Sequence, residues 1–278
     1  MSRDIIRKAK DRVMISLCYL ALIIALIPLV SILLETMMRG IPVINLNFLL
    51  ERIPPLGQSG GGIGPAIQGT LIVVGLASLI GVPVGVISGI YLSEFRESKL
   101  AIAARFLNDV LTNMPSIVVG IFCWTLIVVV VGWSVIAGAV ALAIMMIPIV
   151  ARTTEESMKL VPSTIREAAI ALGIPQWKTT MTVVLSGAKR GIATGILLSI
   201  ARITGETAPL LLTILGSRFW FSGFTEPTAA LPLTIFNFSQ SAFSAIDWPK
   251  AWGTSLILIL MILGINVVVR YCTREKYG

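Results

Sequence analysis

The chain contains no histidine, and only three of its 278 residues are cysteine. Without histidine the sequence lacks the commonest metal ligand and the usual general base of enzymes. Cys18 and Cys123 lie alone in apolar runs, and Cys272 lies beside basic residues, so neither a disulfide framework nor a thiolate metal site is predicted. We therefore expect a protein that is not an enzyme and that binds no metal or cofactor itself.

Charge is also scarce, since 13% of the residues are charged and 56% are hydrophobic. Soluble domains carry about a quarter charged residues, so this composition predicts an all-α polytopic membrane protein surrounded by lipid. The net charge of +8 could indicate a nucleic-acid partner. The basic residues flank the apolar segments and do not gather in one soluble domain, so we expect no nucleic acid.

Six apolar segments are each long enough, at about 20 residues, to cross a bilayer as a helix. We expect these spans near 13–36, 66–92, 106–131, 133–151, 190–215 and 251–270, between a tail at 1–12 and a tail at 272–278. With six spans, 17 Lys and Arg residues fall on the side of the two tails and four on the opposite side. The positive-inside rule then places both termini in the cytoplasm of a cell that carries the chain in its inner or plasma membrane.

A motif with fixed spacing lies in the predicted cytoplasmic loop 152–190. Glu167-Ala168-Ala169 is followed after three residues by Gly173, and after nine more by the sequence VVLS. This pattern resembles the EAA loop of ABC importer permeases, which is the docking element for their ATPase. Composition alone favours an ordinary helix-loop-helix connector, but the joint spacing over about 20 residues favours the dock.

The same loop has the local signals of a short helix. Ser163 or Thr164 can cap a helix that begins near Ile165, and Gly173 with Pro175 can end it. A rigid, capped helix of this kind could transmit a push from a partner into the neighbouring spans. The chain has no Walker A sequence, so we expect ATP and Mg²⁺ to be bound by a separate ATPase subunit.

Three further stretches narrow the resemblance: GGIGPAIQGT at 61–70, NMPSIVVG at 113–120 and GETAPL at 205–210. Together with the loop they are similar to the PstA family of phosphate-specific ABC permeases, and the related PstC family shares several of the patterns. By themselves, the glycines are as compatible with a flexible loop as with substrate contact, and we interpret 113–116 as a helix kink.

The resemblance implies an ABC importer permease fold that forms a path for inorganic phosphate. It also implies a second, PstC-like permease, two copies of a cytoplasmic ATP-binding subunit and an extracytoplasmic phosphate-binding protein. Permeases for molybdate, sulfate or amino acids share the dock, so another oxyanion remains an alternative. A polytopic membrane enzyme is disfavoured by the missing catalytic groups, and a standalone channel by the dock.

Arg202 and Glu206 are the only charges between residues 191 and 217, the apolar stretch of the predicted fifth span. Their spacing of four places them on one face of a continuous helix, and charges at membrane depth usually face a bundle interior. The planar guanidinium of arginine suits phosphate oxygens. A structural ion pair is the competing interpretation. The resembled family implicates this Arg and Glu in phosphate passage, and we add Thr207 to the predicted substrate path.

Overall fold

A computed structural model describes the backbone of residues 2–272, and the predicted tail 272–278 lies, from residue 273 on, outside the described residues. Five helical segments are long and apolar enough to cross a membrane. They belong to α1 (Ser2–Gly40), α3 (Gly64–Glu94), α7 (Val135–Lys159), α10 (Leu185–Thr204) and α13 (Ser244–Cys272). A bent helix pair supplies a sixth crossing if it is counted as one span. The described chain thus has the predicted all-α polytopic architecture.

The bent pair lies where a single continuous span near 106–131 was predicted. Helix α4 (Lys99–Asn113) and the segment Ser116–Val131 meet at an angle of 105°. That second segment consists of α5 (Ser116–Cys123), a π-helical turn (Trp124–Val128) and α6 (Val129–Val131). Pro115 has no N–H and forces Met114 into an extended conformation with ψ 132°, so the helix stops at Asn113. The kink that was inferred for 113–116 is therefore confirmed.

Helix α10 also differs from the predicted span 190–215. It is preceded by α9 (Gln176–Lys178) and a π-helical turn (Thr179–Val184), ends at Thr204 and is followed by α11 (Ala208–Thr213). Pro209 lies in the first turn of α11. Proline there cannot donate a hydrogen bond to the carbonyl four residues earlier, which favours a break in the helix between α10 and α11.

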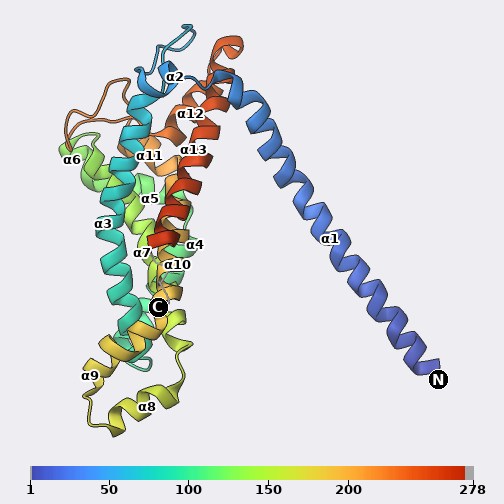
Figure 1. Cartoon of the computed structure of the whole chain (residues 1–278). Helices are drawn as coiled ribbons and strands as arrows, with labels where there is room; N and C mark the ends of the chain where they lie inside the picture. The colour runs from blue at the N-terminus through green and yellow to red at the C-terminus, as the bar shows by residue number, and fades with distance from the viewer. Residues whose placement is uncertain (1, 273–278) are drawn as a thin grey trace.

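The core is built around α7, which packs tightly between α3 and α10 (Figure 1). Each neighbour presents glycines at intervals of four residues, and a Cβ at most of them would come closer than 3.0 Å to an α7 atom. Small residues of this kind let helix backbones approach closely, which is how helices associate in membranes. The glycines are Gly81, Gly85 and Gly89 of α3, and Gly187, Gly191 and Gly195 of α10.

The opposite end of the molecule from α9 carries the connection 41–63, with a 3₁₀ turn (Ile41–Val43) and α2 (Leu46–Leu50), and α12 (Leu231–Ser239). Buried Asp247 holds this end together. Its Oδ2 accepts hydrogen bonds from Gly57 N at 2.8 Å and Ser241 Oγ at 2.5 Å. Lys250 lies 3.5 Å from the same carboxylate and donates to Gln58 O. These bonds fix the loop to the start of α13.

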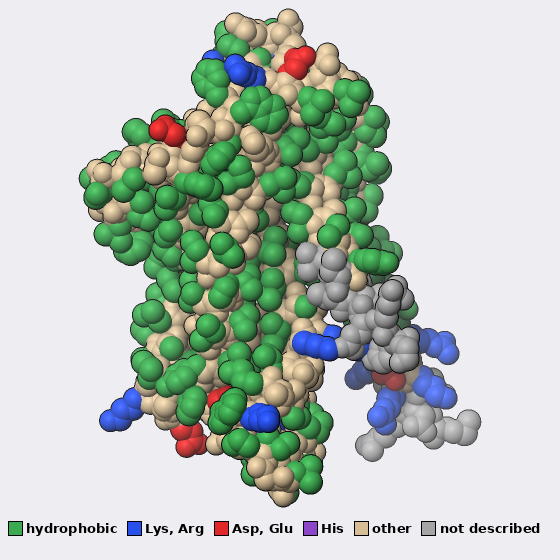
Figure 2. Space-filling model, turned by 60° about the vertical axis from the view of Figure 1, so that its left-hand side comes forward, with side chains coloured by type: hydrophobic (Ala, Val, Ile, Leu, Met, Phe, Trp, Pro, Cys, Tyr) green, Lys and Arg blue, Asp and Glu red, His purple; other side chains and the backbone are tan. Residues whose placement is uncertain are grey.

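Helix α1 leans away from the other helices and contacts α13 at its C-terminal end (Figure 1). It begins toward the end of the molecule that carries α9, and α13 runs toward that same end. Figure 2 shows hydrophobic side chains covering the middle of the molecule, with the charged side chains gathered toward its two ends. This distribution suits a protein that crosses a bilayer.

Candidate functional site

Arg202 lies in the last turn of α10, and the chain leaves the helix immediately after it. Gly205 N donates to Arg202 O at 3.2 Å, and Glu206 N donates to Ile203 O at 3.2 Å. The expectation that Arg202 and Glu206 share one helix face is wrong, because the helix ends at Thr204. The helix dipole stabilises a cation near a helix C-terminus, so the end of α10 stabilises the positive charge of Arg202.

The two charged side chains remain close without a tight contact. Arg202 Nε lies 3.9 Å from Glu206 Oε1, which is longer than a hydrogen bond. The Arg202 side chain is 56% exposed and that of Glu206 is 18% exposed. The guanidinium can therefore offer its planar set of donors to an anion, with a carboxylate beside it that limits how tightly the anion is held.

Two of the singled-out stretches meet next to this pair. Gly120 of α5 packs on Pro209 of α11, where a Cβ on Gly120 would lie 2.9 Å from Pro209 Cα. Thr207 is the N-cap residue of α11, is half-buried and makes no side-chain capping hydrogen bond. The stretches 113–120 and 205–210 thus border one region of the molecule.

The glycine stretch 61–70 lies elsewhere, at the start of α3. A Cβ on Gly62 would lie 2.5 Å from Phe48 O, and one on Gly69 would lie 2.1 Å from Ala229 O. Leu231 N donates to Thr70 Oγ1 at 2.8 Å. These glycines allow close packing of backbone on backbone, so the flexible-loop interpretation does not hold for the buried part of the stretch.

The predicted docking segment forms α8 (Ser163–Ala171), beyond the end of the helix bundle near α9 (Figure 1). The helix begins two residues before the expected Ile165. Its N-cap residue is Pro162 and no side chain caps it, so the predicted capping by Ser163 or Thr164 is wrong. Both residues lie inside the first turn, where their own N–H groups need partners.

The end of α8 agrees with the sequence analysis. Gly173 has φ +80°, a conformation that glycine adopts without steric cost. Its N–H donates to Ile170 O at 2.9 Å, and Ile174 N donates to Ala169 O at 3.2 Å. Glu167 and Ala168 are exposed, whereas Ala169 is buried. Two of the three EAA side chains are thus exposed, and the third packs against the protein.

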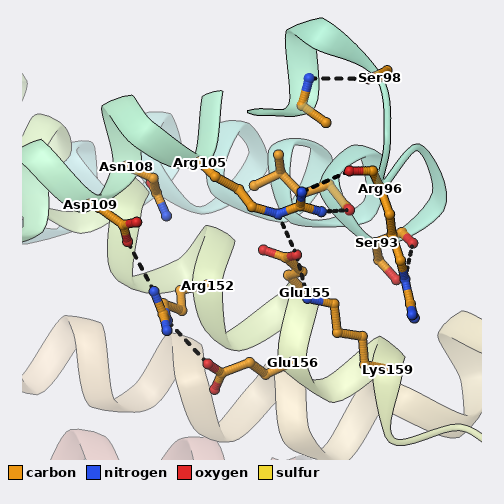
Figure 3. A network of polar contacts seen from close by, with 12 residues as sticks. Ser93, Arg96, Ser98, Arg105, Asn108, Asp109, Arg152, Glu155, Glu156 and Lys159 are labelled. Atoms are coloured by element: carbon orange, nitrogen blue, oxygen red, sulfur yellow. Dashed lines mark hydrogen bonds and ion pairs between the residues drawn. The ribbon is translucent and has the colours of Figure 1, made fainter. Parts of the chain in front are cut away.

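Sequence reasoning missed a polar network that joins α4 to α7 (Figure 3). Arg105 Nε donates to Glu155 Oε1 at 2.9 Å, and Lys159 Nζ lies 2.5 Å from the same oxygen. Arg152 Nη1 contacts Asp109 Oδ1 at 3.0 Å. One signal was available in the sequence: Arg152 and Glu156, and Glu155 and Lys159, are opposite charges four residues apart, a spacing typical of ion pairs on a helix.

Comparison with known proteins identifies the family. The family model "Binding-protein-dependent transport system inner membrane component" matches residues 81–274. "Phosphate transport system permease protein PstA" of Yersinia pestis is 43% identical over 97% of this chain and 92% of its own length. "Probable phosphate transport system permease protein PstA" of Methanocaldococcus jannaschii is 38% identical over 97% of this chain and 96% of its own. The chain belongs to the PstA family of transport permeases.

Solved structures confirm the permease fold. A bacterial alginate ABC transporter, crystallised with a pentasaccharide-bound periplasmic protein, matches with a TM-score of 0.68 over 95% of both chains at 14% identity. The MetNI methionine ABC transporter in an inward-facing conformation matches with a TM-score of 0.60, over 76% of this chain and 98% of its own, at 16% identity. At these identities the likeness establishes the ABC permease fold and nothing about substrate.

Proposed function

We propose that this chain is the PstA-type permease of an ABC importer and forms part of the path for inorganic phosphate. The observation that carries the proposal is the similarity to curated PstA permeases over 97% of the chain. The exposed guanidinium of Arg202 supports it chemically, because arginine binds phosphate oxygens in a planar, bidentate geometry.

Within the path, Arg202 attracts the anion and Glu206 tempers that attraction. Conduction requires binding that favours entry and still allows exit, and a lone desolvated guanidinium could trap a divalent anion. The carboxylate 3.9 Å from Arg202 Nε reduces the net charge that the anion meets. Thr207 follows directly and offers a hydroxyl to the same anion.

The partners are a second, PstC-like permease, two copies of a cytoplasmic ATPase and an extracytoplasmic phosphate-binding protein. The exposure of Arg202 and of residues 10–34 of α1 supports a second permease, since a charge at membrane depth needs protein or water beside it. Glu167, Ala168, Ala169 and Gly173 form the ATPase dock. ATP and Mg²⁺ bind to that partner and not to this chain. Hydrolysis on the partner drives transport, and this chain is a transport subunit and not an enzyme.

The orientation follows from the basic residues. We place both termini and α8 in the cytoplasm of a cell that carries the permease in its inner or plasma membrane, since 17 Lys and Arg lie on that side and four on the other. In a chain without its native cysteines, Ser163→Cys should react with an impermeant thiol reagent from the cytoplasm and Ser59→Cys from outside. Reaction of both from one side would contradict this topology.

Uptake of labelled phosphate by the complete complex in proteoliposomes tests the substrate. ATP enclosed on the side of the ATPase should drive accumulation, and excess unlabelled phosphate should compete while sulfate and molybdate do not. Equal competition by sulfate or molybdate would show that the permease accepts a broader range of oxyanions, or a different one, and would contradict specificity for phosphate. Accumulation that persists without ATP would exclude an ABC importer altogether.

A further inference from the structure

The C-terminal end of α3 is held by a single guanidinium from α4. Arg105 Nη2 donates to Leu92 O at 2.6 Å and Nη1 donates to Arg96 O at 2.9 Å, while Nε donates to Glu155 of α7 at 2.9 Å (Figure 3). The three nitrogens of this guanidinium therefore each donate to a different acceptor, two backbone carbonyls and one carboxylate. This one residue connects α4, the end of α3 and α7.

The chemistry of the helix end explains this arrangement. The last carbonyls of an α-helix have no intrahelical donor, and a cation near them also interacts favourably with the helix dipole. The Glu155 side chain is only 8% exposed and needs a positive partner at that depth. Lysine could supply a charge and three donors, but all from one nitrogen, whereas Glu155, Arg96 O and Leu92 O are reached by three different nitrogens spread over the arginine fork.

The docking helix α8 contacts the same end of α3. Arg166 Nη1 donates to Glu94 Oε1 at 2.5 Å, and the Glu94 side chain is 8% exposed. Glu94 lies between Leu92 and Arg96, whose carbonyls receive Arg105. Within the described residues, α8 and α4 are thus joined to one stretch of five residues, 92–96.

From α4 the chain leads directly to the proposed path. Helix α4 passes through the 105° bend into α5, and Gly120 of α5 packs against Pro209 of α11. Pro209 follows Glu206 and Thr207 by a few residues. A displacement of the end of α3 would therefore be carried by Arg105 into α4, and by the bend into the helices beside Arg202.

We propose that Arg105, Glu94 and Arg166 are positioning residues that transmit movement of the docking helix through the end of α3 to α4 and α5. This inference rests on the proposed docking role of α8. A merely structural clamp would make the same contacts, so a loss of stability cannot distinguish the two roles. They differ in the coupling of ATP hydrolysis to transport, which only a transmitting junction should affect.

The test measures phosphate transported per ATP hydrolysed by purified complexes in proteoliposomes. Arg105→Gln and Arg166→Gln should each lower this ratio by about three-fold or more, with ATPase activity and recovery of the complex largely kept. Recovery should survive in Arg105→Gln because Lys159 stays beside Glu155 as a counter-ion. Arg152→Gln is the matched control: Arg152 also joins α4 to α7, through Asp109, but this pair is exposed, so the ratio should stay unchanged.

The double variant Arg105→Gln with Arg166→Gln shows whether the two contacts act in series. Transmission through one junction predicts a ratio no lower than that of the more severe single variant. Multiplied effects would mean two independent tethers and would overturn the proposal. An equal loss of coupling in Arg152→Gln would overturn it as well, because any α4–α7 ion pair would then suffice.

Should Arg105→Gln lower the recovery of the complex, Arg105→Lys decides. Lysine keeps the charge opposite Glu155 but cannot also hold both carbonyls, so the complex should assemble and remain poorly coupled. Wild-type coupling in Arg105→Lys would refute the role of the junction.

Transport by the wild-type complex distinguishes failure of this proposal from failure of the proposed function. If it moves another anion, the substrate assignment fails, and the ratio measured with that anion still tests the junction.

Discussion

Replacement of Arg202 by glutamine should nearly abolish transport while the complex still assembles. The pair with Glu206 contributes little to stability, because at 3.9 Å and with Arg202 56% exposed two unit charges interact by about 1 kcal/mol in a water-like dielectric. Its loss should change the recovery of the complex by at most about five-fold. An anion held by two charge-assisted hydrogen bonds, at about 1.5–3 kcal/mol each, loses far more.

The expected fall in transport is therefore about 100-fold or greater, well beyond any effect of stability. The assay is initial uptake of labelled phosphate in proteoliposomes, divided by the amount of assembled complex. Arg39→Gln is a matched control, since Arg39 also pairs with a glutamate four residues away and is 57% exposed, but lies on α1. Its uptake should stay close to that of the wild type.

Two results would refute the role of Arg202. One is uptake in Arg202→Gln that falls only in proportion to recovery of the complex, as a structural pair predicts. The other is full transport by the exchanged variant Arg202→Glu with Glu206→Arg, because the positive charge would then have moved by several ångströms along the path. Glu206→Gln alone should keep assembly and slow turnover, since the anion would leave the guanidinium less readily.

Two further predictions concern glycines. Gly173→Ala should weaken co-purification of the ATPase, because its φ of +80° strains any side chain by about 1–2 kcal/mol and would shift α8. The control Gly132→Ala, with φ +90° and equally open space, should keep co-purification. Equal losses in the two variants would contradict a local docking role. Gly89→Ala should lower the free energy of unfolding by about 1–3 kcal/mol, since its Cβ would lie 2.5 Å from Ala151 O. Gly75→Ala, in open space, should be neutral or stabilising. A thermal unfolding assay in detergent that ranks the two variants otherwise would refute the packing of α3 on α7.

The long helices could be predicted because each apolar run is a local property of the chain. Runs of uncharged residues identified α1, α3, α7 and α13, and the spacing from Glu167 to Gly173 identified α8 with its glycine end. The interruption at Pro115 was predicted as a kink, but the angle of 105° between α4 and the segment that begins with α5 was not predicted. Counting charges does not register where a proline removes a backbone donor.

The contacts that hold the molecule together were harder to predict, because they join distant parts of the chain. Arg105 and Glu155 are 50 residues apart, and Arg166 and Glu94 are 72 apart. Each residue alone resembles an ordinary charge flanking a membrane segment. The glycines of α3 and α10 repeat every four residues, which fits close helix packing, but only the structure shows that both rows face α7.

The position of Thr207 offers the most direct test of the proposed phosphate path. In a complex without native cysteines, Thr207→Cys should react with a small, charged, water-soluble thiol reagent, and the reaction should block uptake. Phosphate in excess should slow the reaction, because the anion would occupy the space beside Arg202 and Glu206. A Thr207→Cys complex that transports phosphate normally after complete modification would contradict a path past these residues.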